Sequence, residues 1–184
     1  MRAFIAIDLE PEIKSALQTL VRGLQAARAD IRWVNAGGMH LTLKFLGPIE
    51  GGQTVRVKAI LDDIVRRHAA FSLRLEGTGA FPGERSPRVL WVGVVAEPPL
   101  LALQDEIDRA LEAEGFERER RAFTPHMTIG RVKGPDRVGK AMLELEKHKT
   151  ESFGAMTVRK VALFESLLRP DGAEYRIEYE AALS

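Results

Sequence analysis

The chain has 184 residues, 45% of them hydrophobic, which is enough for one substantial core or for two small lobes that share a cleft. Its 27 Lys and Arg side chains nearly balance 26 Asp and Glu side chains, and a net charge of +1 argues against a uniformly basic surface that binds duplex nucleic acid. Cysteine is absent, which excludes disulfides, thiolate zinc sites and a cysteine nucleophile.

The first apolar stretch of the chain is interrupted early by Asp8, so it does not form the apolar segment of a secretory signal. No other stretch approaches the roughly 20 apolar residues that a membrane-spanning helix needs. Together with the absence of cysteine, these features predict a soluble, cytoplasmic protein without a membrane partner.

Hydrophobic periodicity in the first half of the chain predicts alternating strands and helices. Pro11 stands where a helix can begin, and apolar residues follow it at helical spacing. Within residues 40–47, the polar His40, Thr42 and Lys44 alternate with apolar residues, which is typical of a strand with one polar and one apolar face. The predicted elements here are strands 2–9, 31–34, 40–47 and 71–76, and helices 11–24 and 53–68.

The second half of the chain begins after a connection predicted at residues 77–87, which hold three glycines and two prolines. The strongly apolar residues 88–95 are typical of a buried strand. A turn is predicted from Arg169 to Gly172, between the last two strands. The predicted elements are strands 88–95, 123–131, 156–167 and 175–181, and helices 100–114 and 138–148.

The order of predicted elements repeats along the chain. His126 follows His40 by 86 positions, and each half reads as strand, helix, short strand, histidine strand, helix and strand. We therefore predict an α+β fold with two pseudo-symmetric lobes, each a mainly antiparallel sheet with helices outside, and an active-site cleft between the sheets. The whole chain, 1–184, would form one bilobal domain from approximate halves 1–77 and 88–158, with strands in 160–183 completing the sheets.

The tripeptide His-x-Thr occurs twice, at His40–Thr42 and at His126–Thr128. Residues two apart on a strand point to the same face, so each histidine shares a surface with its threonine. A threonine hydroxyl can donate a hydrogen bond to a phosphoryl oxygen. An imidazole can accept or donate a proton near neutral pH. Two such histidines beside one phosphorus would supply a base and an acid without a metal.

Strict alternation along the two strands makes predictions for the residues that follow. It places Lys44 on the face of His40, where a phosphate contact and simple solvation are both open, and it places Phe45 in the core. It also places Arg131 on the face opposite His126, so Arg131 would need a twist, a bulge or a long reach to meet a ligand there.

The two motif segments resemble the signatures of the 2H phosphoesterase superfamily. They read His40-Leu-Thr-Leu-Lys-Phe-Leu-Gly47 and Phe123-Thr-Pro-His-Met-Thr-Ile-Gly-Arg131. Within that superfamily the chain is similar to the bacterial and archaeal RNA 2′,3′-cyclic phosphodiesterases, long called 2′-5′ RNA ligases. The resemblance extends over nearly the whole chain, including Arg2-Ala-Phe-Ile-Ala-Ile7, Arg32-Trp-Val34, Arg88-Val-Leu-Trp-Val-Gly93 and Leu163-Phe-Glu-Ser-Leu-Leu168.

The resemblance implies hydrolysis of a terminal 2′,3′-cyclic phosphate on RNA to a 2′-phosphomonoester, without a cofactor or metal. It implies that His126 activates water and that His40 protonates the leaving 3′ oxygen, although the two motifs are so alike that their sequences leave this division open. By the same resemblance, Thr42 and Thr128 hold phosphate oxygens, and Arg131 lies near the substrate. The implied partner is an RNA 3′ end or oligonucleotide with a cyclic phosphate, bound by a monomer.

Three alternatives remain open from the sequence. The same site could act on another cyclic phosphate or on a 2′-5′ linked nucleotide, and 2′-5′ ligation could occur as a minor reverse reaction. The chain could also be a non-catalytic module that binds an RNA end or nucleotide. A metal-binding protein is disfavoured, because no local cluster such as His-x-x-x-His is present.

Overall fold

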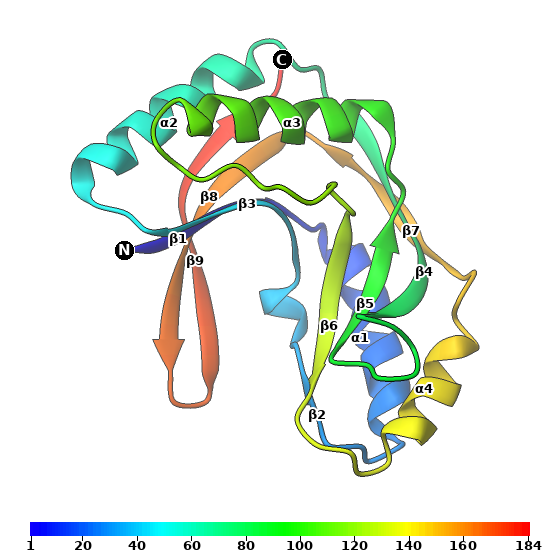
Figure 1. The fold of residues 1–184 in the computed structure, drawn as a ribbon. Helices are drawn as coiled ribbons and strands as arrows, with labels where there is room; N and C mark the ends of the chain where they lie inside the picture. The colour runs from blue at the N-terminus through cyan, green and yellow to red at the C-terminus, as the bar shows by residue number, and fades with distance from the viewer.

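The computed structural model describes all residues from Met1 to Ser184 and contains two antiparallel sheets with helices outside them (Figure 1). The four-stranded sheet has the order β3 (His40–Pro48), β1 (Arg2–Asp8), β8 (Lys160–Arg169) and β9 (Gly172–Ala182). The five-stranded sheet has the order β2 (Ile31–Trp33), β6 (His126–Val132), β5 (Val89–Val94), β4 (Phe71–Phe81) and β7 (Ser152–Val158). The predicted α+β fold with two antiparallel sheets is confirmed.

Four α-helices and one 3-10 turn complete the chain. Helices α2 (Gly51–Val65) and α3 (Pro98–Glu112) pack beside each other and contact the four-stranded sheet, whereas α1 (Pro11–Gln25) contacts β7 and α4 (Val138–Glu146) contacts β4. The 3-10 turn η1 (Ala36–Gly38) precedes β3. No helix combines the length and the apolar composition that crossing a bilayer requires. Each pair of helices therefore covers the outside of one sheet, as predicted.

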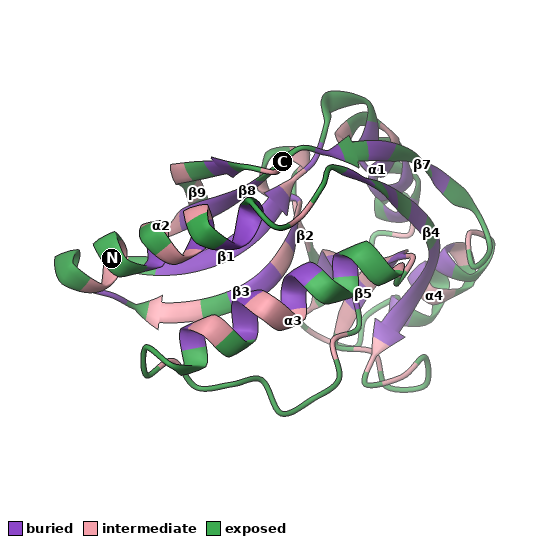
Figure 2. Cartoon of the chain, turned by 90° about the horizontal axis from the view of Figure 1, so that it is seen from above, coloured by how far each residue is buried: buried purple, intermediate pink, exposed green.

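The first helix illustrates why these elements form where they do. Pro11 occupies its first turn, where the missing N–H is not needed. The buried residues recur every three or four positions, so one stripe faces the sheet and the rest faces solvent. Those buried residues are Ile13, Leu17, Leu20, Val21 and Leu24. Figure 2 shows the same division on α2 and α3, where buried and exposed residues occupy different sides of each helix.

The strand predicted over residues 156–167 is wrong, because the chain divides there into two strands of different sheets. β7 ends at Val158 and pairs with β4, and β8 begins at Lys160 and pairs with β1. The sequence on both sides of Arg159 is β-forming, so only the pairing partners reveal the break. Strands are thereby exchanged along the chain: β2 and β4 of the first half join the five-stranded sheet, and β8 and β9 near the end of the chain join β1 and β3 in the four-stranded sheet.

One strand boundary and one predicted repeat also differ from the structure. β4 continues through Gly77 and Gly79 to Phe81, where a connection was predicted, because the glycines serve a bulge and a close contact inside the strand. The second half has no counterpart of β2, since no strand lies between Glu112 and His126. The repeat in element order is therefore approximate.

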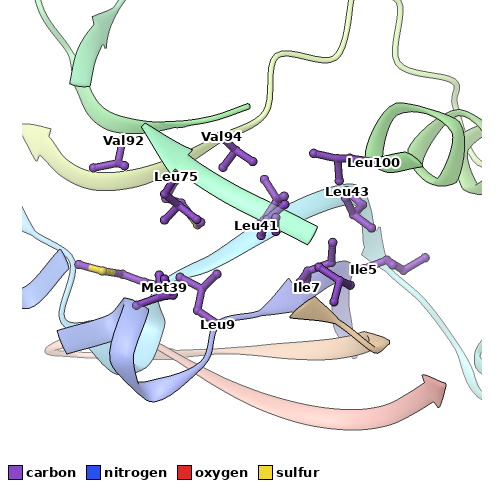
Figure 3. Close-up of a cluster of buried hydrophobic side chains, with 14 of the residues drawn as sticks. Ile5, Ile7, Leu9, Met39, Leu41, Leu43, Leu75, Val92, Val94 and Leu100 are labelled. Carbon is purple, nitrogen blue, oxygen red and sulfur yellow. The ribbon is translucent and has the colours of Figure 1, made fainter. Parts of the chain in front are cut away.

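One hydrophobic core extends beneath both sheets. Leu41 and Leu43 of β3 lie in the same buried cluster as Leu75, Val92 and Val94 of the five-stranded sheet (Figure 3). Strand β3 also contacts strand β6 directly. Because alternate residues of a strand point to opposite faces, the polar positions of both histidine strands lie on the side away from this shared core.

Candidate active site

The two histidine strands share an irregularity that sets the geometry of the site. On β3 the register with β1 skips Leu43, directly after Thr42. On β6 the register with β5 skips Ile129, directly after Thr128. A bulge of this kind leaves one residue unpaired and moves every later side chain to the face opposite the one that alternation predicts. Both bulges fall three positions after the motif histidine, so they reshape the two strands in the same way.

The bulge on β6 brings Arg131 to the face of the His-x-Thr motif. His126, Thr128 and Arg131 pair with alternate residues 93, 91 and 89 of β5, and residues opposite each other in an antiparallel pair share a face. Strict alternation, which places Arg131 opposite His126, therefore fails here, and the bulge that Arg131 needs in order to share the face of His126 is present. The Arg131 side chain is exposed on the side of the histidine, where it can meet an anion. We call the surface that carries His40, Thr42, His126, Thr128 and Arg131 the two-histidine face.

The bulge on β3 removes Lys44 from the two-histidine face. Lys44 is only 6% exposed, and its Nζ donates hydrogen bonds of 2.5 Å to Asp108 of α3 and to the backbone oxygen of Glu117. The prediction that Lys44 shares the face of His40 is wrong, because the extra residue turns it inward. Its ammonium donates to acceptors in α3 and in the segment after α3, so it is not placed to contact a ligand on the two-histidine face.

The same bulge turns Phe45 outward. Phe45 pairs with Phe4 of β1 and is 75% exposed, although alternation predicts that it lies in the core. The two motifs thus place Phe45 and Arg131 at equivalent positions, five residues after their histidines, and both side chains reach solvent.

Aromatic rings surround His40. Its imidazole stacks on Phe4 at 4.6 Å between ring centroids and meets the edge of Tyr175 at 4.9 Å. Burial lowers the pKa of His40 to about 4, against the opposing charge of Asp8. The Lys14 ammonium, which forms a 2.9 Å ion pair with Asp8, lowers this pKa further, and a hydrogen bond to the Gly38 backbone raises it. His40 is consequently neutral near pH 7 in the free protein.

His126 is held by the backbone just before it. Its Nδ1 lies 2.7 Å from the carbonyl oxygen of Thr124. A carbonyl oxygen can only accept, so Nδ1 carries the proton in the neutral ring and Nε2 keeps a free lone pair. The ring also meets Phe81 edge to face at 4.9 Å. The His126 ring is thus held by the carbonyl two residues upstream, that of Thr124.

The aromatic neighbours of the histidines were missed in the sequence. They come from other strands of the two sheets, β1, β8 and β9 around His40 and β4 and β5 around His126, and only the sheet registers bring them to the two histidines. The ring of Trp91 lies over Gly79, where an added Cβ would come within 2.3 Å of it, and the indole Nε1 is buried without a hydrogen-bond partner. No signal in the sequence indicated this contact, because Gly79 fell in a predicted connection and not in a strand.

Thr42 and Thr128 are half-buried beside their histidines, with their hydroxyls on the same face. The structure has no group of three or more His, Asp or Glu side chains placed to hold a metal ion. The side chains gathered on this face are therefore two imidazoles, two hydroxyls and a guanidinium. This set can bind an anion and move protons on either side of it.

Two antiparallel sheets that exchange strands, with a His-x-Thr strand in each sheet, define the two-histidine class of phosphoesterases. The chain belongs to the 2′-5′ RNA ligase superfamily, whose family model matches residues 9–169. The resemblance seen in the sequence is thereby confirmed.

Individual relatives agree along the full length of the chain. A protein of Methanothermobacter thermautotrophicus named RNA 2′,3′-cyclic phosphodiesterase is 34% identical over 175 residues, which are 95% of each chain. The crystal structure of TT0787 of Thermus thermophilus matches with a TM-score of 0.84 and 29% identity, covering 100% of this chain and 98% of that one. The structure of Escherichia coli LigT complexed with 3′-AMP matches with a TM-score of 0.76 and 25% identity, covering 100% and 98%.

Proposed function

We propose that this protein hydrolyses 2′,3′-cyclic phosphates at RNA ends to 2′-phosphomonoesters by metal-independent acid–base catalysis. The observation that carries the proposal is the presence of a His-x-Thr pair, followed by an equivalent bulge, on each of two strands that contact each other, β3 and β6. The name RNA 2′,3′-cyclic phosphodiesterase, which full-length relatives bear, supports the substrate class. The complex of LigT with 3′-AMP supports a site that accepts a nucleoside phosphate.

In the proposed reaction, Nε2 of His126 takes a proton from water while the water oxygen attacks phosphorus. The bond between phosphorus and the 3′ oxygen breaks, and His40 donates a proton to that oxygen. Thr42 and Thr128 donate hydrogen bonds to the phosphoryl oxygens, and the Arg131 guanidinium supplies positive charge for the phosphate. The free lone pair on Nε2 of His126, left by the bond from Nδ1 to Thr124, favours His126 as the base.

His40 must be protonated to act as the acid, yet burial holds its pKa at about 4 in the free protein. An anionic phosphate beside the ring favours the imidazolium and raises this pKa. Substrate binding therefore favours protonation of His40, which can then act as the acid. In the free protein the aromatic surroundings keep His40 neutral. Reversal of transesterification at the same site would form a 2′-5′ bond as a minor activity.

We infer that this activity belongs to a monomer, because one chain holds both histidines of the proposed site, and to the cytoplasm, because a chain without cysteine fits a reducing compartment. The testing experiment incubates a short RNA that ends in a 2′,3′-cyclic phosphate with the wild type, His40→Ala and His126→Ala, in EDTA. His148→Ala is the matched control, because His148 lies beside Glu151 and away from the two-histidine face.

The wild type and the control should yield a 2′-phosphate, and each motif variant should lose about 100-fold or more in rate. An inactive wild type, motif variants as active as the control, or a requirement for added metal would overturn the proposal. A wild type that binds the RNA end and never turns it over would identify a binding module instead.

A further inference from the structure

Two arginines stand directly opposite each other at the edge of the five-stranded sheet. Arg32 of β2 pairs with Arg131 of β6, and residues opposite each other in an antiparallel pair share a face. A Cβ at Gly130 would come within 2.9 Å of Ile31 and of Trp33, which pack in or against the core. Because neighbouring residues of a strand point to opposite faces, Arg32 and Arg131 both point away from the core, to the two-histidine face.

The two guanidiniums have no counter-charge within the protein. Both side chains are exposed, and neither forms an ion pair or a side-chain hydrogen bond. Like charges that face each other across an antiparallel pair repel and destabilise it, and a bound anion removes this cost. In the proposed reaction Arg131 serves the phosphate that reacts. Arg32 therefore remains available for a second anionic group.

The Arg32 side chain also extends to the other sheet. Its Nη2 lies 3.5 Å from the position that a Cβ of Gly172 would take, at the tip of the hairpin formed by β8 and β9. Figure 1 shows this hairpin projecting from its sheet, with its tip at the height of β2. Three residues further along β9, Tyr175 meets the ring of His40 at 4.9 Å. Arg32 thus lies between the edge of one sheet and the hairpin of the other, near both motif strands.

The distance from Arg32 to the phosphate site corresponds to about one nucleotide. Arg131 follows Thr128 by three residues, which is roughly 10 Å along β6, and β2 lies about 5 Å to the side of β6. At this separation Arg32 lies beyond the reacting phosphate, which is bound between the two His-x-Thr pairs. It lies within reach of the next phosphate along an RNA strand, one nucleoside away.

We propose that Arg32 binds the phosphodiester on the 5′ side of the terminal nucleoside, so that the site prefers an oligonucleotide to a mononucleotide. This inference rests on the proposed function and adds a second anionic contact to it. A guanidinium binds phosphate oxygens through two parallel N–H groups. Contacts with phosphate position a strand without reading its bases, so Arg32 contributes affinity for RNA of any sequence.

The experiment compares three substrates that differ in their second phosphate. They are adenosine 2′,3′-cyclic phosphate, adenylyl-(3′→5′)-adenosine 2′,3′-cyclic phosphate, and the same dinucleotide with an uncharged methylphosphonate in place of its phosphodiester. The variants are Arg32→Ala, Arg32→Lys and the control Arg22→Ala, which removes an exposed arginine of α1 that also forms no ion pair. Steady-state kinetics give kcat and KM for each substrate.

Arg32→Ala should raise KM for the charged dinucleotide about tenfold with kcat unchanged. The same variant should leave KM unchanged for the mononucleotide and for the methylphosphonate. Arg32→Lys, which keeps the charge but not the paired N–H groups, should lose less than Arg32→Ala, and Arg22→Ala should match the wild type. An unchanged KM for the charged dinucleotide, or an equal loss on all three substrates, would overturn the second phosphate contact.

A binding measurement separates this inference from the proposed function. Calorimetry gives the affinities for 3′-AMP and for adenylyl-(3′→5′)-adenosine 3′-phosphate at a series of NaCl concentrations. Arg32→Ala should weaken binding of the dinucleotide alone and reduce the slope of its log affinity against log salt by about 0.7, the value for one phosphate of a single strand.

The two failures are then distinguishable. If the wild type hydrolyses no substrate, the proposed activity fails, but this selective loss of dinucleotide binding would still establish the contact. If hydrolysis proceeds and Arg32→Ala binds the dinucleotide as tightly as the wild type, the contact fails and the activity stands.

Discussion

His40 combines a polar function with apolar surroundings. Phe4, Phe164 and Tyr175 all lie within 5.5 Å of its imidazole, measured between ring centroids. Burial therefore disfavours the imidazolium and holds the pKa at about 4, below the ordinary 6.5. The lowered pKa of His40 leads to two predictions, one for folding stability and one for ligand binding.

Folding stability should depend on pH through His40. Between pH 4 and pH 6.5 the unfolded chain binds more protons at this residue than the folded chain does, so stability falls as pH falls through this window. The loss should reach about 3 kcal/mol near pH 4 if no other group intervenes. Urea unfolding at a series of pH values should show this slope in the wild type and a shallower one in His40→Asn. Equal slopes would show that His40 is not its source.

A bound phosphate should raise the pKa of His40. The negative charge favours the imidazolium, so NMR titration of the imidazole signals should move the His40 midpoint upward when 3′-AMP is added. The variant His40→Asn assigns the signal, because it lacks the titrating imidazole. If the titration midpoint of His40 did not move, the proposal that bound substrate promotes protonation of His40 would be wrong.

At the scale of elements, the bulges on β3 and β6 and the glycines of β4 set the site. Gly79 pairs with Trp91 and leaves room for its ring. The Trp91 ring in turn contacts Phe81, which packs edge to face on His126. The position of one imidazole therefore depends on the absence of a Cβ two strands away.

Gly79→Ala should damage both stability and activity. Its Cβ would lie 2.3 Å from Trp91, so the indole must shift, at a cost of about 1–3 kcal/mol in the free energy of unfolding. Displacement of Phe81 and His126 should also lower kcat. Gly23→Ala, on α1 with no atom within 4 Å of the added Cβ, should be neutral or stabilising by up to about 1 kcal/mol. Chemical unfolding and initial rates test both variants, and similar behaviour of the two would refute the steric argument.

At the scale of the whole molecule, the buried ion pair between Lys44 and Asp108 ties the first histidine strand to a helix of the second half of the chain. Lys44 also bonds the backbone oxygen of Glu117, at the start of the segment that leads to His126. The pair thus links the two lobes on the side away from the site.

Breaking this pair should destabilise the whole protein. Asp108→Asn leaves a buried ammonium without its counter-charge and should cost about 3–5 kcal/mol. The double variant Lys44→Met, Asp108→Leu should recover much of that loss, because it removes both charges together. Lys147→Ala, which removes an exposed pair with Glu144, should change stability by less than about 1 kcal/mol. Urea unfolding measures all three, and a loss in Asp108→Asn no larger than in Lys147→Ala would contradict the structural role.

The shared core should make the two lobes unfold together. Leu41 is fully buried in the cluster that also holds Val92 of the other sheet. Leu41→Ala should cost about 2–5 kcal/mol, and tryptophan fluorescence and far-UV circular dichroism should still report one coincident transition. Trp33 and Trp91 both belong to the five-stranded sheet, so separate transitions would show that the lobes fold independently.

The sequence by itself determined most of the elements and the chemistry of the motifs. Alternating polar and apolar residues identified the histidine strands, and the spacing of two residues put each threonine beside its histidine. These features are local, because they depend on the backbone period and on the side chains of one segment. The resemblance to a known family added the expected reaction and the roles of the histidines.

Only the tertiary structure decided which side chains meet. The bulges after Thr42 and Thr128 exchanged Lys44 with Phe45 and brought Arg131 to the two-histidine face. The break at Arg159 sent two adjacent strands to different sheets. Bulges, registers and strand exchange follow from pairing between segments far apart in the chain, and a local pattern is equally compatible with either outcome. The residue types were therefore readable in advance, whereas their faces and partners were fixed by long-range packing.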